Sequence, residues 1–119
     1  MPYKILVVED EPLVRMLAVE VVEAAGFEAI EAANADDAIK LLEAITDIRI
    51  VFTDIDMPGS MDGLRLAAAV SDRWPPIHII VVSGAKRPEA GDLPDRGVFF
   101  SKPYDVGLVT RTMHRMLEA

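Results

Sequence analysis

The sequence contains no cysteine, which excludes disulfide bonds, thiolate nucleophiles and zinc–thiolate sites together. It also lacks any run of 18 consecutive apolar residues, so no segment is expected to span a membrane. The apolar run Ile5–Val8 is too short for the core of a signal peptide, and acidic residues follow it at once. We therefore expect a cytoplasmic location.

Basic residues are also in short supply. The chain has 12 Lys and Arg against 20 Asp and Glu, a formal net charge of −8 at pH 7. Nucleic acids and anionic membrane surfaces both attract clustered Lys and Arg, so this balance argues against either partner. The 119 residues fit one domain over 1–119, because domains most often contain roughly 100–150 residues.

Short runs rich in β-branched residues alternate along the chain with stretches of helical spacing. The runs predict strands at Tyr3–Val8, Phe27–Glu31, Ile48–Thr53, Ile77–Val82 and Gly97–Phe100. Such alternation in a short chain predicts an α/β fold, an open parallel sheet with helices on both faces. Right-handed crossover connections then leave few topologies.

Apolar residues at helical spacing predict four helices and their buried faces. The predicted inward residues are Leu13, Val14, Leu17, Val21 and Val22 in the first, Ala38, Ile39, Leu42 and Ile45 in the second, and Leu64, Ala67, Ala68 and Val70 in the third. The last helix is expected from about Tyr104 to Glu118, with Val109, Met113, Met116 and Leu117 inward. Asn34 suits the N-cap of the second helix, and Gly26 suits the position just after the first.

The segment Ala85–Arg96 interrupts this alternation where a further helix belongs. Pro88, Gly91 and Pro94 fall within seven positions, and proline removes an amide donor and clashes with the preceding turn. We therefore predict a loop with at most a short helical turn. A brief helix between the prolines is the alternative.

Polar residues follow four of the five predicted strands. Glu9 and Asp10 follow the first strand, Asp54 and Asp56 the third, Ser83 the fourth and Lys102 the fifth. Ligands of open α/β sheets bind beyond the carboxyl ends of the strands, where these side chains should meet. A solvated loop carboxylate explains any one acid alone. The convergence of acids, a hydroxyl and a lysine at one edge is much harder to explain by chance.

Clustered carboxylates repel one another unless a cation joins them. Oxygen ligands without His or Cys favour a hard ion, Mg²⁺ or Mn²⁺. A carboxylate can also attack phosphorus to form an acyl phosphate, and the metal and a lysine then neutralise the charge on the phosphoryl oxygens. The same residues are therefore suited to phosphoryl transfer.

The motifs along the chain resemble the receiver domains of two-component systems. The resemblance is carried, in order, by Ile5–Pro12, Val51–Pro58, Met61–Gly63, Ser83-Gly84 and Lys102-Pro103. It covers essentially the whole chain. It implies the flavodoxin-like strand order 2-1-3-4-5, for which receiver domains are a standard example. Because of the proline-interrupted segment Ala85–Arg96, the family's fourth helix is expected to be short or absent here.

The resemblance also implies a role for each site residue. Asp54 would be the phosphoacceptor, Lys102 the phosphate-contacting lysine and Ser83 the switch hydroxyl. The metal ligands implied are Glu9, Asp10, Asp54 and the backbone carbonyl of Asp56. Phe99 would be the aromatic switch residue, turned outward while Phe100 faces the core. The peptide bond between Lys102 and Pro103 would be cis.

Two departures from the usual motifs bear directly on the site. Glu9 replaces the more usual Asp, and its extra methylene is expected to shift metal affinity. Ser83 stands where Thr is common, and loss of the β-branch frees its χ1 angle.

The resulting functional expectation is a stand-alone receiver that a histidine kinase or phosphotransfer protein phosphorylates. It would not act as an enzyme on an outside substrate, and it would signal to an output protein that the sequence does not identify. Homodimerisation through the face of the fifth strand and last helix is a further expectation. The alternatives are a pseudo-receiver that works without phosphorylation and a metal-dependent phosphatase, suggested by the Asp-x-Asp pattern of Asp54 and Asp56.

Overall fold

The computed structural model describes residues 3–89 and 91–118, which form a sheet of five parallel strands between two pairs of helices. The strands pair in the order β2-β1-β3-β4-β5. Both the α/β class and the predicted strand order are confirmed. The elements are β1 (Lys4–Val8), α1 (Pro12–Ala24), β2 (Glu28–Ala32), α2 (Ala35–Ala44), β3 (Ile48–Asp54), α3 (Gly63–Arg73), β4 (His78–Ser83), β5 (Gly97–Ser101) and α4 (Val106–Leu117).

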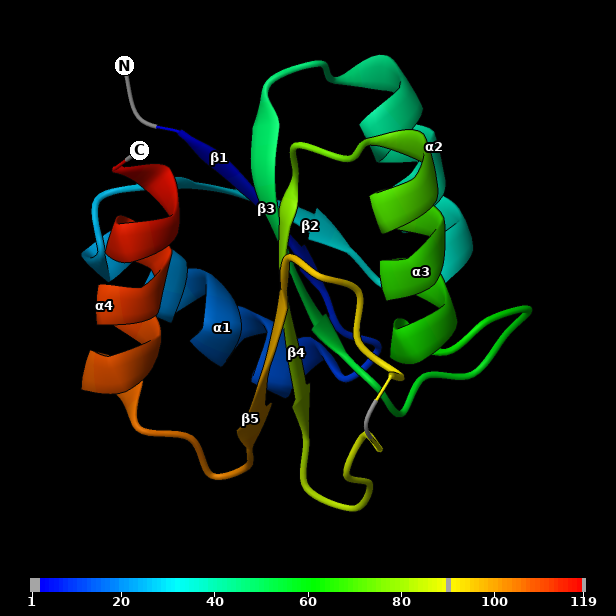
Figure 1. Ribbon diagram of the computed structural model, residues 1–119. Coiled ribbons are helices and arrows are strands. Elements are labelled where there is room, and N and C mark those ends of the chain that lie inside the picture. The colour runs from blue at the N-terminus through cyan, green and yellow to red at the C-terminus, as the bar shows by residue number, and fades with distance from the viewer. Residues whose placement is uncertain (1–2, 90, 119) are drawn as a thin grey trace.

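The two helix pairs cover opposite faces of the sheet. Figure 1 shows α1 and α4 on one side, and α2 and α3 on the other. Alternate residues of β1 enter two separate cores: Leu6 and Val8 pack on the α2/α3 side, whereas Ile5 and Val7 pack on the α1/α4 side. Because helices cover both faces, β1 has to be apolar at successive positions.

The helices are short and begin at defined residues. The side chains of Asn34, Asp62 and Asp105 each accept a backbone N–H three residues later, at 2.8 to 3.0 Å, and so cap α2, α3 and α4. Gly26, with φ of 96°, follows the end of α1 as predicted. The longest helix, α1, has 13 residues, and in the described part of the chain no helix could cross a bilayer.

The predicted buried face of α1 is correct for Val22 but wrong for Leu13 and Leu17. Val22 is fully buried, whereas Leu13 and Leu17 have exposed fractions of 72% and 60%, and Ala18 is buried against the sheet in their place. Apolar residues occupy most of the circumference of α1, so helical spacing could not identify the face that packs. The cluster beneath α1 contains the bulky Phe52, which leaves room for a small residue such as Ala18. The helix therefore presents its larger apolar side chains to solvent.

Two smaller expectations about the helices also need correction. In α3, Ala68 is exposed and Leu66 is buried in its place. The last helix begins at Val106 rather than near Tyr104, because Asp105 is its N-cap. Its predicted inward residues agree with the structure, since Val109 and Met113 are fully buried.

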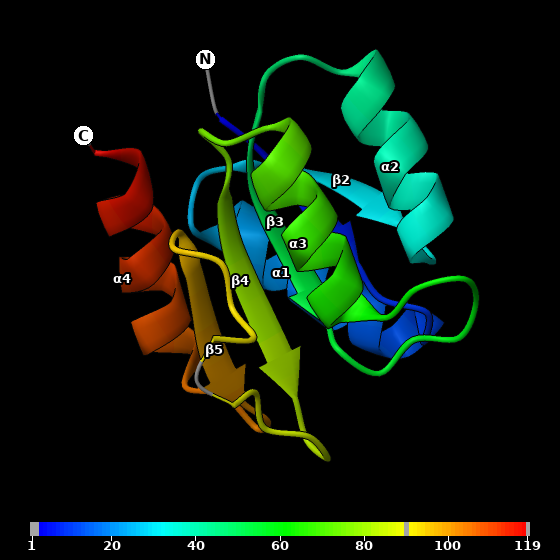
Figure 2. The same cartoon turned by 45° about the vertical axis from the view of Figure 1, so that its right-hand side comes forward.

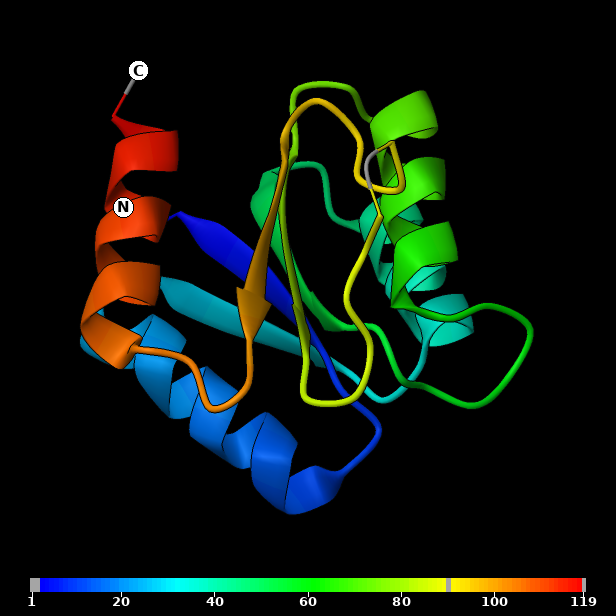
Figure 3. The ribbon, with the colours of Figure 1, turned by 60° about the horizontal axis from the view of Figure 1, so that its bottom comes forward.

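The segment between β4 and β5 contains no helix among its described residues, which leave out position 90. The prediction of a loop is confirmed. The segment lies on the α3 side of the sheet (Figures 2 and 3), where Leu93 packs against the α2/α3 core. A loop thus covers the part of β5 that a helix would otherwise cover.

The start of α3 depends on a glycine. The amide of Gly63 donates to the carbonyl of Ile55 at 3.0 Å, and a Cβ at this position would clash with the backbone carbonyl of Asp54. We expect Gly63→Ala to lower the free energy of unfolding by about 2–4 kcal/mol, because backbone must move to admit the methyl group. Denaturant unfolding measures this change.

Gly84→Ala is the matched control. A Cβ there would lie 3.6 Å from the Cβ of Lys102, an ordinary contact. Its effect on stability should stay within about 0.5 kcal/mol. Equal stabilities of Gly63→Ala and the wild-type protein would contradict the close approach of Gly63 to the backbone carbonyl of Asp54.

Candidate functional site

The carboxyl ends of β1, β3, β4 and β5 meet at one edge of the sheet, at the bottom of Figure 1. This edge brings together Glu9, Asp54, Ser83 and Lys102, as the sequence predicts. Glu9, Asp54 and Ser83 are buried, with exposed fractions of 5%, 7% and 1%. Three polar side chains are therefore withdrawn from solvent, which costs free energy unless each finds a partner.

Lys102 supplies the main partner. Its Nζ donates to Asp54 Oδ2 at 2.6 Å and to Glu9 Oε1 at 3.3 Å, so that one ammonium contacts both carboxylates. Backbone amides satisfy the other oxygens: Asp56 N donates to Asp54 Oδ1 at 2.9 Å, and Glu11 N donates to Glu9 Oε2 at 3.1 Å. The site is fully hydrogen-bonded, yet two carboxylates share a single ammonium.

This imbalance separates the proton affinities of the two acids. Burial, reinforced by the nearby Asp54, raises the pKa of Glu9 to about 7. Burial also acts to raise the pKa of Asp54, but hydrogen bonds with Glu9, Lys102 and the Asp56 amide outweigh it and leave that pKa below its ordinary value. Asp54 is therefore the ionised member of the pair at neutral pH, and ionised carboxylate oxygen is the nucleophilic form.

The donor set at this edge fits a hard cation. Glu9 and Asp54 offer carboxylate oxygens that Lys102 only half neutralises, the type of ligand that Mg²⁺ prefers. Over residues 3–89 and 91–118, no three acidic or histidine side chains converge into a metal cluster. Asp10 thus does not complete one with Glu9 and Asp54. It lies beyond β1, half-buried, where the chain turns towards α1.

Ser83 is bonded to Asp56 rather than to Asp54. Its hydroxyl donates to Asp56 Oδ2 at 2.9 Å and accepts the backbone amides of Ala85 and Lys86 at 3.2 and 2.9 Å. Lys86 Nζ lies 3.5 Å from the other oxygen of Asp56. Sequence reasoning missed Lys86, because it lies in the proline-interrupted segment, where no periodic pattern places side chains.

Phe99 and Phe100 point to opposite faces of β5, but the predicted contrast in burial is wrong. Both are half-buried: Phe99 packs at the margin of the α2/α3 core and Phe100 at the margin of the α1/α4 core. The reason is that β5 is an edge strand. The guanidinium of Arg87 lies 5.8 Å from the centre of the Phe99 ring, within the range of a cation–π contact.

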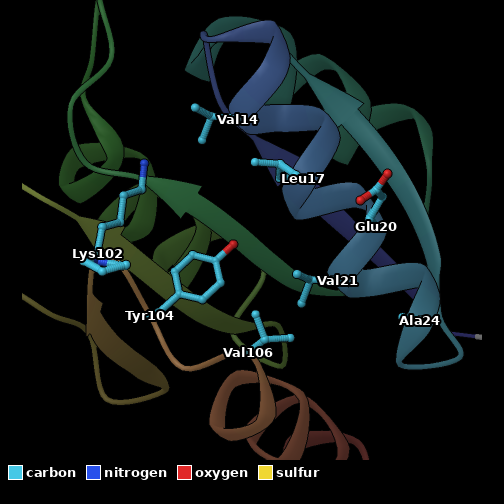
Figure 4. Close-up of a pocket in the computed structure, with 9 residues that line it drawn as sticks. Val14, Leu17, Glu20, Val21, Ala24, Lys102, Tyr104 and Val106 are labelled. Atoms are coloured by element: carbon cyan, nitrogen blue, oxygen red, sulfur yellow. The ribbon is translucent and has the colours of Figure 1, made fainter.

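An apolar groove of about 690 Å³ runs beside this site. Figure 4 shows side chains of α1, including Val14 and Leu17, on one wall, and Tyr104 and Val106 on the other. Lys102 lines both this groove and the small cavity that contains Asp54. The exposed apolar residues of α1 therefore lead directly to the carboxylate pair.

The Lys102–Pro103 bond at the groove's edge is cis, the isomer that the resemblance implies.

The raised pKa of Glu9 predicts a pH-dependent stability. The folded protein holds a proton on Glu9 up to about pH 7, whereas the unfolded chain releases it near the ordinary value of 4.5. Wild-type stability from this group is thus complete below about pH 4.5 and is lost as pH rises through 7. Glu9→Gln cannot ionise, so in EDTA it should gain about 1–3 kcal/mol relative to wild type between pH 5 and pH 8.

Urea unfolding at the two pH values measures this difference. The matched control is Glu43→Gln, which removes an exposed carboxylate that pairs with Arg73 outside the site. If the difference in free energy of unfolding between Glu9→Gln and the wild-type protein is the same at both pH values, Glu9 does not hold a proton in the folded protein up to about pH 7.

Comparison with known proteins gives a consistent result. The chain matches the response regulator receiver domain family over residues 5–111. It is 35% identical over 118 residues to the sensor kinase CckA of Brucella abortus, a match that covers 96% of this chain and 12% of CckA. It is 29% identical to the response regulator receiver protein CpdR of Brucella abortus, with 98% of both chains covered.

Solved structures show the same architecture. The crystal structure of a response regulator receiver protein from Sinorhizobium medicae superposes with a TM-score of 0.91, at 24% identity, over 99% of this chain and 96% of that one. At this identity the likeness shows the fold. The family match extends from β1 into α4 and includes the edge at which Glu9, Asp54, Ser83 and Lys102 meet. The chain belongs to the response regulator receiver domain family.

Proposed function

We propose that this chain accepts a phosphoryl group on Asp54 from a histidine kinase or phosphotransfer protein, with Mg²⁺, and signals to a protein partner by changing conformation. Receiver domains are signalling modules that interact with such phosphodonors. The observation that carries the proposal is the environment of Asp54: a buried, ionised carboxylate at the end of β3, bonded to Lys102 and next to a second acid.

The transfer requires one bond to form and one to break. An oxygen of the Asp54 carboxylate attacks phosphorus, the P–N bond to the donor imidazole breaks, and its electron pair returns to the ring. Lys102, held at 2.6 Å from Asp54, lies where it can neutralise a phosphoryl oxygen without moving far. Mg²⁺ held by Glu9, Asp10, Asp54 and the Asp56 carbonyl would supply further positive charge.

The two alternative functions have less support. A pseudo-receiver would not need Asp54, Ser83 and Lys102 together at one edge. A phosphatase of the Asp-x-Asp type needs its second acid free for proton transfer, and here the Asp56 carboxylate contacts Ser83 and Lys86.

We further propose that the chain works as a single-domain regulator, which its match to CpdR over 98% of both chains supports.

We propose that the phosphodonor docks on the groove between α1 and the start of α4. The donor histidine has to reach Asp54, and Lys102 joins the groove to the Asp54 cavity. Leu17 of this groove exposes 60% of its surface, and Leu13 and Met16 of the same helix expose 72% and 56%. Apolar side chains at such spacing suit an amphipathic helix that carries the histidine.

Phosphorylation can be tested with acetyl phosphate and Mg²⁺. The intact mass of the wild-type protein should rise by one phosphoryl group, and Asp54→Asn should gain none, because an amide is not a nucleophile for phosphorus. EDTA should abolish the gain. A wild-type protein that gains no mass with any donor or divalent metal contradicts the proposal, and turnover of free phosphate esters would favour the phosphatase.

Docking can be tested with Leu17→Glu, which places a charge in the groove. Phosphotransfer from a purified histidine kinase that phosphorylates the wild-type chain should slow by about tenfold or more, as expected for loss of an interface anchor. Phosphorylation by acetyl phosphate should not change, since no docking is involved. Leu108→Glu, an exposed residue of α4 outside the groove, is the control. Equal slowing in both variants would argue against this docking surface.

A further inference from the structure

Two consecutive residues of the β4–β5 segment contact Phe99 and the carboxylate that accepts the Ser83 hydroxyl. Lys86 Nζ lies 3.5 Å from Asp56 Oδ1, and the other oxygen of that carboxylate accepts the Ser83 hydroxyl. Arg87 lies over the ring of Phe99. The segment is thus joined to the candidate switch residues at adjacent positions.

The Ser83 hydroxyl has a single proton, which it donates to Asp56 at 2.9 Å. It cannot donate that proton to a phosphoryl oxygen on Asp54 without leaving Asp56. The side chain of Asp56 is therefore a competing acceptor. The phosphoryl group, with more negative charge and more acceptor oxygens than a carboxylate, is the stronger one.

We propose that Asp56, Lys86 and Arg87 form a latch that holds the unphosphorylated state. Asp56 retains the Ser83 hydroxyl, and Lys86 and Arg87 hold the β4–β5 segment against Asp56 and Phe99. When the hydroxyl turns to the phosphoryl group, Asp56 loses its donor and the amides of Ala85 and Lys86 lose their acceptor, and the segment moves together with Lys86, Arg87 and Phe99. This inference rests on the proposed function of Asp54.

The contacts of the latch are weak enough to be reversed by one event. Side chains of Lys86 and Asp56 are 60% and 38% exposed, and ion pairs in such positions contribute little stability. The backbone amides of Ala85 and Lys86 also depend on Ser83, because its oxygen is their acceptor. Movement of this one hydroxyl therefore removes two attachments of a segment that contains no helix in its described part.

The hold on Ser83 can be tested without phosphorylation. In Asp56→Ala the hydroxyl loses its acceptor, and hydrogen exchange at the amides of Ala85 and Lys86 should accelerate about three- to tenfold, as expected for loss of one hydrogen bond. Asp36→Ala is a matched control, because Asp36 accepts the hydroxyl of Ser60 far from the segment. Unchanged exchange in Asp56→Ala would overturn the competing-acceptor role.

The link to Phe99 needs the phosphorylated protein. With acetyl phosphate and Mg²⁺, the ring resonances of Phe99 should shift in the wild-type protein. A variant with both Lys86→Met and Arg87→Met should gain the same mass, yet its Phe99 shift should fall below about half of the wild-type change. Arg96→Met, which removes an arginine of the same segment that contacts His78, should retain the full shift.

The outcomes separate this inference from the proposed function. A full Phe99 shift in the phosphorylated double variant would overturn the latch and leave phosphorylation intact. Absence of any mass gain in the wild type would instead overturn the function of Asp54, and the exchange measurement on Asp56→Ala would still decide whether Asp56 holds Ser83.

Discussion

The contact of one lysine with two buried carboxylates organises the functional edge of this protein. Lys102 follows β5 at the edge of the sheet, whereas Glu9 follows β1 and Asp54 ends the central strand β3. The three side chains therefore meet only when β1, β3, β4 and β5 are in register. Because one ammonium cannot neutralise two carboxylates, a proton remains on Glu9 near pH 7 while Asp54 is ionised. The oxygens of Glu9 and Asp54 could exchange this proton for a metal cation, which would supply positive charge for an anionic phosphoryl group.

The surroundings of this site differ on its two sides. On the α1 side, the helix turns small residues to the sheet and exposes large ones, which leaves an apolar groove ending at Lys102. On the α3 side, the Ser83 hydroxyl is bonded to Asp56, and a loop replaces a helix between β4 and β5. One side carries an apolar groove, and the other carries a segment held by few contacts. Under the functions proposed above, input and output use different faces.

Several features of the site and fold could be predicted from the sequence because they follow from local chemistry. Buried parallel strands must be apolar, so β1, β3 and β4 are visible as runs of β-branched residues. Parallel strands also deliver the residues after their ends to one edge, which placed Glu9, Asp54, Ser83 and Lys102 together. Prolines 88 and 94 remove helical hydrogen bonds, which explains why the described residues around them form no helix. The metal-binding role of Asp10 stays a prediction.

Other features were decided only by tertiary packing. Helical spacing could not show which side of α1 faces the sheet, because apolar residues surround the helix and Phe52 beneath it selects Ala18 over Leu17. Strand alternation predicted that Phe99 and Phe100 lie on opposite faces. It could not predict that both are half-buried, which reflects the edge position of β5. The bonds of Ser83 to Asp56 and of Lys86 to Asp56 join residues far apart in the chain. The sequence by itself thus determined the fold and the residues that meet at the site, whereas side-chain partners depended on how the assembled elements pack.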